Sequence, residues 1–349
     1  MPATVPAPFK VAAVQAAPVF LDRDATVAKA CALIAEAGRL GARLAVFPET
    51  FIPAYPDWVW LVPLSERALL NDLYGELLDQ SVTVPSDVTQ VLGDAARRAG
   101  VHVVMGLNER NTESSGGSLY NSLVYIDDQG RLVGRRRKLV PTGPERLVWA
   151  QGDGSTFNTW ESPLGRLGAL ICWENYMPLA RYAMFAWGAE LYLAPTWDCG
   201  EPWLSSLRHI AKEGRLHVVG VCQALRVSDI PDRCAHKRFY AHGREWANPG
   251  DSAVVNPDGQ FIAGPVNRRE DIVVGEVAPG KQRGVKWSLD VAGHYARPDI
   301  FQLTVNRDSR PMIRVAEDAA GAMSVAAMKR RTRTSRAATR TRRRSKRRR

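Results

Sequence analysis

Residues 167–176 read LGALICWENY, an apolar run that ends at Cys172 and gives way to Trp173, Glu174 and Asn175. The run has the length and composition of a buried β-strand. A cysteine in such a run is usually a small buried hydrophobe, but it can also be a nucleophile displayed where the strand ends. The second interpretation requires a base and a cation from elsewhere in the chain, because only the thiolate is strongly nucleophilic.

Short apolar runs rich in β-branched residues recur along the chain and predict further buried strands. The runs are residues 11–15, 44–47, 101–105, 123–126, 167–171, 191–193, 218–222 and 272–277. Helical patterns separate several of these runs, and turn residues in two places predict hairpins. The helices are expected at 24–40, 178–187 and 203–215, and the hairpins at 125–130 and 255–259. Crossover helices together with hairpins indicate a layered α/β fold with mixed sheets.

The positive charge of the chain is concentrated at its C-terminal end. The 349 residues carry a net charge of +11, and residues 329–349 contain 13 Lys and Arg with no Asp or Glu. The remaining residues therefore carry −2, so the basicity says nothing about the folded body. The basic end has almost nothing apolar to bury, and we expect it to be disordered from about residue 329.

Five cysteines are scattered without a repeated spacing, which suggests no disulfide framework. The N-terminal residues lack the charged start, apolar centre and cleavage site of a signal peptide. No apolar stretch has the length needed to span a bilayer, so no membrane partner is expected. These features favour the reducing cytoplasm as the location.

Several common catalytic motifs are absent, among them G-x-S-x-G, H-E-x-x-H and the P-loop. Cys234, His236, His242 and Cys222 offer four metal-binding side chains, but their spacing lacks the tight pairs of a structural zinc site. Loop residues without a metal are the favoured interpretation of this group.

Three expected strands deliver polar side chains where they end. Glu49 follows the run at 44–47, Lys138 follows a hairpin strand and precedes Glu145, and Cys172 ends the run at 167–171. Strand ends are where side chains converge in open α/β sheets. Taken singly, each charged residue could be solvated or part of a surface ion pair. Taken together, a thiol, a base and a cation are a workable catalytic set.

These motifs resemble the nitrilase branch of the carbon–nitrogen hydrolase superfamily. The resemblance rests on FPETFIPAYPDW (47–58), RRRKLVPTGPERLVWAQGDGS (135–155), ICWENYMPLARYAM (171–184), PTWD (195–198), LRHIAKEGR (207–215) and GHYARPDIF (293–301). It covers residues 8–307 approximately, in family order. We therefore expect a single hydrolase domain over residues 1–310 and a C-terminal extension over 311–349.

The resemblance implies a four-layer α-β-β-α sandwich with catalytic roles at four positions. Glu49 matches the general base, Lys138 the lysine, Cys172 the nucleophile and Glu145 the additional glutamate of many members. The implied reaction converts an organic nitrile to a carboxylic acid and ammonia through a thioimidate and a thioester on Cys172, with an amide as a side product. No metal or organic cofactor is required. Many nitrilases have a bulkier pair of residues where this chain has Gly143-Pro144. This loop is close to the substrate in the family, so the difference puts the substrate specificity in doubt.

The residues that flank the matched motifs are candidates for lining the substrate pocket, although ordinary packing would also account for them. They are Tyr55, Trp173, Pro195, Thr196 and Trp197. Their aromatic character favours an aryl or arylaliphatic nitrile.

Three other functions remain open at this stage. Amide hydrolysis and cyanide hydrolysis occur in the same superfamily, although Trp173-Glu174 argues against the amidases. A protein that binds polyanions or nucleic acid through its basic end is the alternative from another class. Residues 329–349 contain no aromatic residues between the basic ones, so they lack the stacking side chains that would support such a role. The resemblance also implies a homo-oligomer, either a dimer or a larger, spiral assembly.

Overall fold

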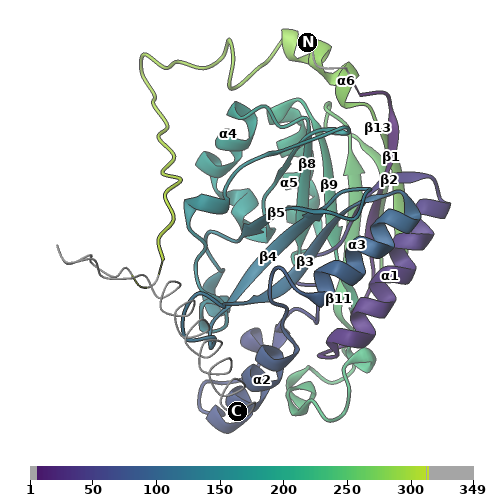
Figure 1. Ribbon diagram of the computed structural model, residues 1–349, viewed down its shortest axis with the longest axis vertical. Coiled ribbons are helices and arrows are strands. Elements are labelled where there is room, and N and C mark those ends of the chain that lie inside the picture. Colours follow the sequence, from purple (N-terminus) through teal and green to yellow (C-terminus); the bar gives the residue numbers. More distant parts are fainter. Residues whose placement is uncertain (1–5, 312, 314–349) are drawn as a thin grey trace, which may run out of the picture. The chain divides into compact units, whose positions relative to one another are not determined.

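Two mixed β-sheets form the centre of the protein (Figure 1). The computed structural model describes residues 6–311 and 313, and residues 6–309 belong to one compact unit. The first sheet has the strand order β13 (Asp271–Val277), β1 (Phe9–Gln15), β2 (Ala42–Val46), β3 (His102–Arg110), β4 (Leu119–Ile126) and β5 (Leu132–Arg137). Its strands β1, β2 and β3 are parallel, and the other pairs are antiparallel.

The second sheet has the order β10 (Ala224–Arg226), β11 (Trp246–Val255), β9 (His217–Cys222), β8 (Leu191–Thr196), β7 (Gly165–Ala169) and β6 (Trp160–Ser162), with β12 (Phe261–Asn267) paired to β11. Its central strands β7, β8 and β9 are parallel. Each of these strands is buried along almost its whole length, as expected for parallel strands with both faces covered.

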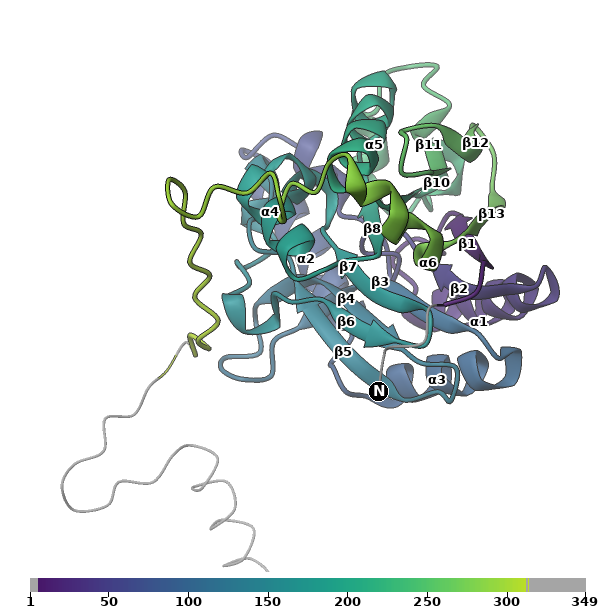
Figure 2. The ribbon, with the colours of Figure 1, turned by 90° about the horizontal axis from the view of Figure 1, so that it is seen from above.

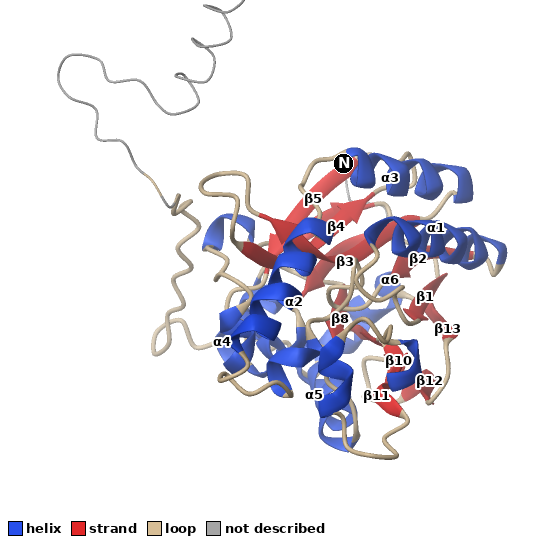
Figure 3. Cartoon of the chain, turned by 90° about the horizontal axis from the view of Figure 1, so that it is seen from below, coloured by secondary structure: helices blue, strands red, loops and turns tan. Residues whose placement is uncertain are grey.

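Helices cover the outer face of each sheet, as Figures 2 and 3 show. On the first sheet, α1 (Arg23–Arg39) and α3 (Asp87–Ala99) pack with the strands around a core that includes Ile34 and Leu92. On the second, α4 (Pro178–Ala186) and α5 (Glu201–Gly214) pack around Met184 and Trp203.

A third apolar cluster joins the facing surfaces of the two sheets. It contains Val11 and Leu44 from the first sheet and Leu167 and Leu193 from the second, all buried. Successive side chains of a strand point to opposite faces of its sheet. Alternate residues therefore pack in this cluster, and the residues between them pack against a helix layer. The four-layer α-β-β-α sandwich with mixed sheets is therefore confirmed.

Three helices, α2 (Arg67–Gln80), α3 and the single-turn α6 (Pro279–Gln282), have no counterpart among the elements expected from sequence. Helix α3 carried recognisable end signals, since Ser86 and Thr89 form a capping box and Gly100 ends the helix in the left-handed conformation. Helix α2 buries only Leu73 and Leu77 completely, so its apolar stripe is narrow. The helices and hairpins that were predicted lie within one or two residues of their expected bounds.

The strand predicted at 167–171 ends two residues early, at Ala169. The backbone N–H of Ile171 donates to the side chain of Glu174, and so does not continue the sheet. Across residues 6–311, no helix is long and apolar enough to cross a bilayer. The domain boundary near residue 310 stays a prediction, and the basic stretch that begins at Lys329 lies outside the described residues.

Candidate active site

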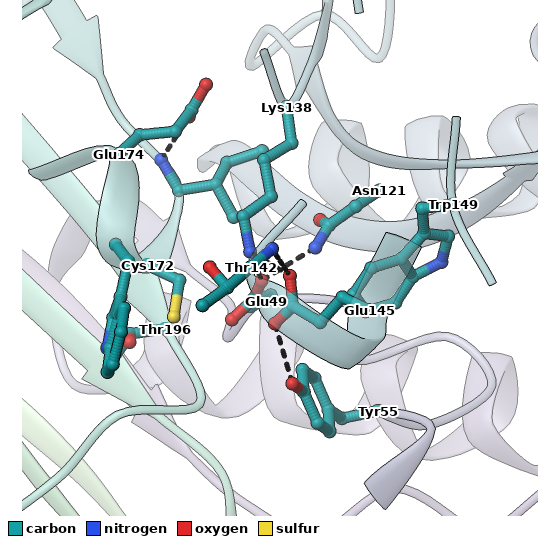
Figure 4. Close-up of polar contacts among 12 residues, drawn as sticks. Glu49, Tyr55, Asn121, Lys138, Thr142, Glu145, Trp149, Cys172, Glu174 and Thr196 are labelled. Carbon is teal, nitrogen blue, oxygen red and sulfur yellow. Dashed lines mark hydrogen bonds and ion pairs between the residues drawn. The ribbon is translucent and has the colours of Figure 1, made fainter. Parts of the chain in front are cut away.

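The ends of three strands from both sheets meet at one buried point. Glu49 follows β2, Lys138 follows β5 and Cys172 follows β7. A carboxylate oxygen of Glu49, one of Glu145 and the sulfur of Cys172 all lie within 4.8 Å of one another (Figure 4). The structure thus brings together the four side chains proposed to act in catalysis.

Lys138 is held between the two glutamates. Its Nζ lies 2.7 Å from Glu49 Oε1 and 2.8 Å from Glu145 Oε2, and all three side chains are buried. Burial alone would lower the pKa of Lys138, but the negative charges of Glu49 and Glu145 raise it above its usual value. The ammonium therefore remains charged at neutral pH, and the basic run 135–138 is not a solvated surface at this position.

Glu49 has one occupied and one free oxygen. Its Oε1 accepts hydrogen bonds from Lys138 and, at 2.6 Å, from Asn121 Nδ2 on β4. Its Oε2 is buried without a hydrogen-bond partner among the described residues. Burial raises the pKa of Glu49 above its usual range, although Lys138 opposes this shift. A carboxylate of this kind can accept a proton near neutral pH.

The backbone around Glu49 depends on a glycine in the neighbouring strand. A Cβ atom on Gly106 of β3 would lie 2.0 Å from the carbonyl oxygen of Pro48 and 2.7 Å from the nitrogen of Thr50. Only glycine allows β3 to pass this close to the chain that carries Glu49. The Nε2 of Gln223 donates to the Glu49 carbonyl at 2.8 Å and fixes the same turn from the second sheet.

Glu145 lies in a short 3₁₀ helix (Gly143–Leu147) and is fixed by three donors. Its Oε2 accepts from the backbone of Thr142 at 2.7 Å and from Lys138, while its Oε1 accepts from the Tyr55 hydroxyl at 2.6 Å. With both oxygens engaged, this carboxylate is better placed to orient Lys138 and Tyr55 than to accept a proton. It is not in the surface ion pair considered as an alternative.

Cys172 opens a 3₁₀ turn (Cys172–Tyr176) with a positive φ of 52°. Residues other than glycine rarely adopt this left-handed conformation, which here separates the cysteine from its strand. Burial raises the pKa of the Cys172 thiol well above its usual range, and the Glu49 charge raises it further. Lys138 and a hydrogen bond from Thr196 oppose that rise. The thiol is therefore neutral at rest and needs a base in order to react.

Comparison with known proteins identifies the family. Residues 10–286 match the carbon–nitrogen hydrolase family. The chain belongs to the carbon–nitrogen hydrolases. Several nitrilases are among the relatives that it resembles over most of its length. It is 40% identical over 307 residues to an aliphatic nitrilase of Sinorhizobium fredii, with 87% of this chain and 98% of that protein covered. It is 38% identical to nitrilase 1 of Arabidopsis thaliana over 87% and 88% of the two chains.

A bifunctional nitrilase/nitrile hydratase of Nicotiana tabacum is also 38% identical, with 84% of both chains covered. Among solved structures, Nit3 of Saccharomyces cerevisiae has the same fold, with a TM-score of 0.66 at 20% identity over 83% of this chain and 97% of that one. An amidase from Nesterenkonia sp. gives a TM-score of 0.59 at 18% identity, covering 79% and 92%. The chain is a nitrilase, and the fold of its superfamily is confirmed independently by these structures.

The five predicted pocket residues of the nitrilase differ in their relation to the site. Tyr55 is buried and stacks on Trp197, with ring centroids 4.4 Å apart and an angle of 4° between the rings. Thr196 contacts Cys172, and Pro195 is buried within β8 beside it. Trp173 is 49% exposed, and its indole N–H donates to Asp198. The structure places Tyr55, Thr196 and Trp197 at the site and Trp173 largely in solvent.

The residues considered as a metal site belong to different surroundings. His236 stacks on Phe20, while Cys222 donates to Asn248 at 3.3 Å. In the described part of the chain, the only group of His, Cys, Asp and Glu atoms close enough to share an ion is Glu49, Glu145 and Cys172. The ammonium of Lys138 already provides the cation in that group.

Three further residues of the site lie outside the motifs recognised in the sequence. Asn121 is a polar residue inside the fully buried strand β4, which is a weak signal. Gln223 follows β9 directly, and its side chain reaches across to the other sheet. Trp60 donates to the Tyr55 hydroxyl at 2.9 Å, and Gly143, part of the departing pair noted in the sequence, lies beside its ring.

The hydrogen bond from Asn121 predicts a change in pH dependence. In Asn121→Leu, Glu49 loses a donor that favours its charged form, so its pKa rises further. If Glu49 acts as the base, the acid limb of the kcat/KM profile moves to higher pH, which a pH series of ammonia release measures. Ser122→Ala is the matched control, because the Ser122 hydroxyl donates to Glu109 instead. An unmoved acid limb in Asn121→Leu would show that Glu49 is not the titrating base.

Proposed function

We propose that this nitrilase hydrolyses its nitrile through a covalent intermediate on Cys172. One observation carries the proposal: a buried thiol lies within 4.8 Å of two buried glutamates, and a buried lysine pairs with both of them. The thiol can attack the nitrile carbon, Glu49 can take its proton, and Lys138 can stabilise the charge that develops. The roles of nucleophile, base and stabilising cation therefore go to Cys172, Glu49 and Lys138, respectively.

The first half of the reaction forms a thioimidate. The thiol proton of Cys172 passes to the free Oε2 of Glu49 as sulfur attacks the carbon of the C≡N bond. One π bond of the nitrile breaks, and its electron pair moves to nitrogen next to the Lys138 ammonium. The nitrogen then takes the proton from Glu49, which restores the carboxylate.

The second half uses two water molecules. Glu49 removes a proton from the first water as the water oxygen adds to the thioimidate carbon, and the C=N π electrons move to nitrogen, which takes that proton from Glu49. Glu49 then transfers the proton of the new hydroxyl group to nitrogen, and the C–N bond breaks to release ammonia and leave a thioester. A second water adds in the same way, and collapse of that intermediate releases the carboxylic acid and the Cys172 thiol. If the first tetrahedral intermediate expels sulfur instead, an amide leaves. The name of the bifunctional relative from Nicotiana tabacum supports an amide side product.

We further propose that the substrate is an aryl or arylaliphatic nitrile. Tyr55 and Trp197 stack beside the catalytic group, and Trp60 extends this aromatic wall. Aromatic rings favour an aromatic ligand by offset or edge contacts as well as by area. The relative from Sinorhizobium fredii is named an aliphatic nitrilase, so both substrate classes have to be compared directly.

The test is ammonia and acid release from a panel of aliphatic, aromatic and arylacetic nitriles, together with benzamides and cyanide. We expect the aryl-bearing nitriles to give a kcat/KM about tenfold or more above that of short aliphatic nitriles. Equal or higher values for the aliphatic nitriles would overturn the substrate assignment. Turnover of benzamides or cyanide without turnover of any nitrile would establish one of the two alternative superfamily activities.

We also propose that the enzyme works in the cytoplasm as a homo-oligomer. Its five cysteines are free thiols, and an oxidising setting would threaten the catalytic one. Leu179 at the start of α4 is 67% exposed, and Trp173 in the preceding turn is 49% exposed. Exposed apolar side chains of this size support contact with a second copy. Separately, and from the sequence alone, we propose that the basic residues from Lys329 onward bind polyanions without specificity.

A further inference from the structure

Glu174 is a fully buried carboxylate that connects the two loops bearing the proposed nucleophile and the proposed lysine. We propose that it is a positioning residue, which sets the place of Cys172 relative to Lys138 without touching the substrate. The inference rests on the proposed function, because it assigns a purpose to the distance between those two side chains. Figure 4 shows Glu174 beside Cys172 and facing away from the carboxylates of Glu49 and Glu145.

Each oxygen of Glu174 binds the backbone next to a different catalytic candidate. Its Oε2 accepts from the N–H of Ile171 at 2.8 Å, directly before Cys172. Its Oε1 accepts from the N–H of Leu139 at 2.6 Å, directly after Lys138. These two loops come from different sheets, so a single side chain crosses between them and fixes their separation.

The conformation at Cys172 needs such support. Its positive φ is unfavourable for a residue with a side chain, and it persists only where the surroundings hold it. Asn175 provides the opposite half of the support, since its Nδ2 donates to the carbonyl oxygens of Leu170 at 3.0 Å and Cys172 at 2.7 Å. Buried side chains therefore hold the 170–171 peptide, one residue before the sulfur-bearing residue, and the 172–173 peptide directly after it.

The charge of Glu174 is balanced away from the catalytic group. Arg136 Nη2 lies 2.9 Å from Glu174 Oε2, and both side chains are completely buried. A carboxylate suits this place because it only accepts, and all three of its partners are donors. The amide of a glutamine would turn an NH₂ group toward at least one of those donors, and so could not satisfy both loops at once.

A purely structural ion pair is the competing explanation, and the chain offers a matched control for it. Glu109 is equally buried and also pairs with arginines of β5, lying 2.7 Å from Arg135 and 2.6 Å from Arg137. Unlike Glu174, it has no hydrogen bond to the backbone that adjoins Cys172 or Lys138. Loss of Glu109 therefore costs a buried ion pair without releasing either loop.

The experiment compares Glu174→Gln with Glu109→Gln by two readouts. One is kcat and KM for a nitrile. The other is the rate at which iodoacetamide alkylates Cys172 as a function of pH, followed by mass spectrometry of its peptide. For Glu174→Gln we expect kcat to fall by about 100-fold, since a displacement of about 1 Å can cost that much, with KM unchanged within about threefold. We expect alkylation of Cys172 to slow by about tenfold in the same variant.

For Glu109→Gln we expect both readouts to stay within about threefold of the wild type, even where the melting temperature falls as much as in Glu174→Gln. Equal losses of kcat in the two variants would reduce Glu174 to a structural role. The alkylation readout needs no nitrile turnover, so it tests the positioning role even if the proposed reaction is wrong. Should Glu174→Gln not fold, Glu174→Asp keeps the charge but is too short to reach both loops, and the same losses are expected; unchanged alkylation in that variant would overturn the inference.

Discussion

Replacement of Cys172 by alanine is expected to lower nitrile turnover by about 10⁶-fold, the scale found when the nucleophile of a catalytic unit is removed. Without the sulfur, no bond to the nitrile carbon can form. A water molecule activated by Glu49 would have to attack a linear nitrile directly, in a site shaped for a covalent intermediate. The measurement is ammonia release at saturating nitrile, with the folded state checked by thermal unfolding.

The control for this variant is Cys31→Ala, which removes a half-buried thiol from α1, far from the catalytic strand ends. We expect Cys31→Ala to keep the wild-type rate within about threefold. Cys172→Ser keeps the shape of the side chain but has a far less acidic nucleophile, and should be nearly as inactive as Cys172→Ala. Turnover by Cys172→Ala at the rate of the Cys31→Ala control would rule out the proposed mechanism.

Replacement of Lys138 by methionine is expected to have two separable effects. The kcat for nitrile hydrolysis should fall by about 10³-fold, because the developing negative charge loses its stabilising cation. Lys138 also lowers the pKa of Glu49 against the effect of burial, so its loss raises the pKa of the base further and shifts it toward its protonated form. The free energy of unfolding should fall by about 3–5 kcal/mol, since two buried carboxylates lose their common partner. Single-turnover kinetics and urea unfolding measure the two effects.

Lys138→Arg separates charge from geometry. The guanidinium keeps the positive charge, so part of the lost stability should return. It cannot reproduce the compact ammonium that lies 2.7 and 2.8 Å from the two carboxylates, so the rate should stay low. Full activity in Lys138→Met, with an unchanged unfolding midpoint, would show that the lysine neither stabilises the site nor takes part in the reaction.

The broad architecture was predictable from sequence because it depends on local patterns. Apolar runs of strand length, helical periodicity and turn residues each report on a few neighbouring residues, and their order indicates a layered α/β fold with mixed sheets. The four-layer sandwich was implied only by the resemblance to nitrilases. The same reasoning identified Glu49, Lys138 and Cys172, since each stands where a strand ends. The resemblance to nitrilases then supplied Glu145, whose place in a loop gives no such signal.

The remainder of the site depends on contacts between residues far apart in the chain. Asn121 and Glu49 are joined by a hydrogen bond across 72 positions, and Tyr55 and Glu145 across 90. No periodicity or short motif records such a pairing. The left-handed conformation of Cys172 was likewise invisible, because nothing in the letters CWEN shows that the strand stops at Ala169.

The arginines before Lys138 show how burial can reverse an interpretation based on charge. A run of four basic residues usually lies in water. Here Arg136 is completely buried against Glu174 and Arg137 pairs with Glu109, so all of the run except the partly exposed Arg135 lies inside the protein. Each buried cation has a carboxylate partner, which is the condition under which such charges are tolerated.

The central claim is that catalysis passes through a bond between Cys172 and the carbon of the nitrile. The most direct test is to mix the wild-type enzyme with a nitrile, quench the reaction in acid during turnover, and determine the mass of the peptide that contains Cys172. The proposed mechanism predicts an added imidoyl or acyl group on Cys172 that disappears when the substrate is exhausted. Continuous turnover with an unmodified Cys172, or with the added mass on another residue, would contradict it.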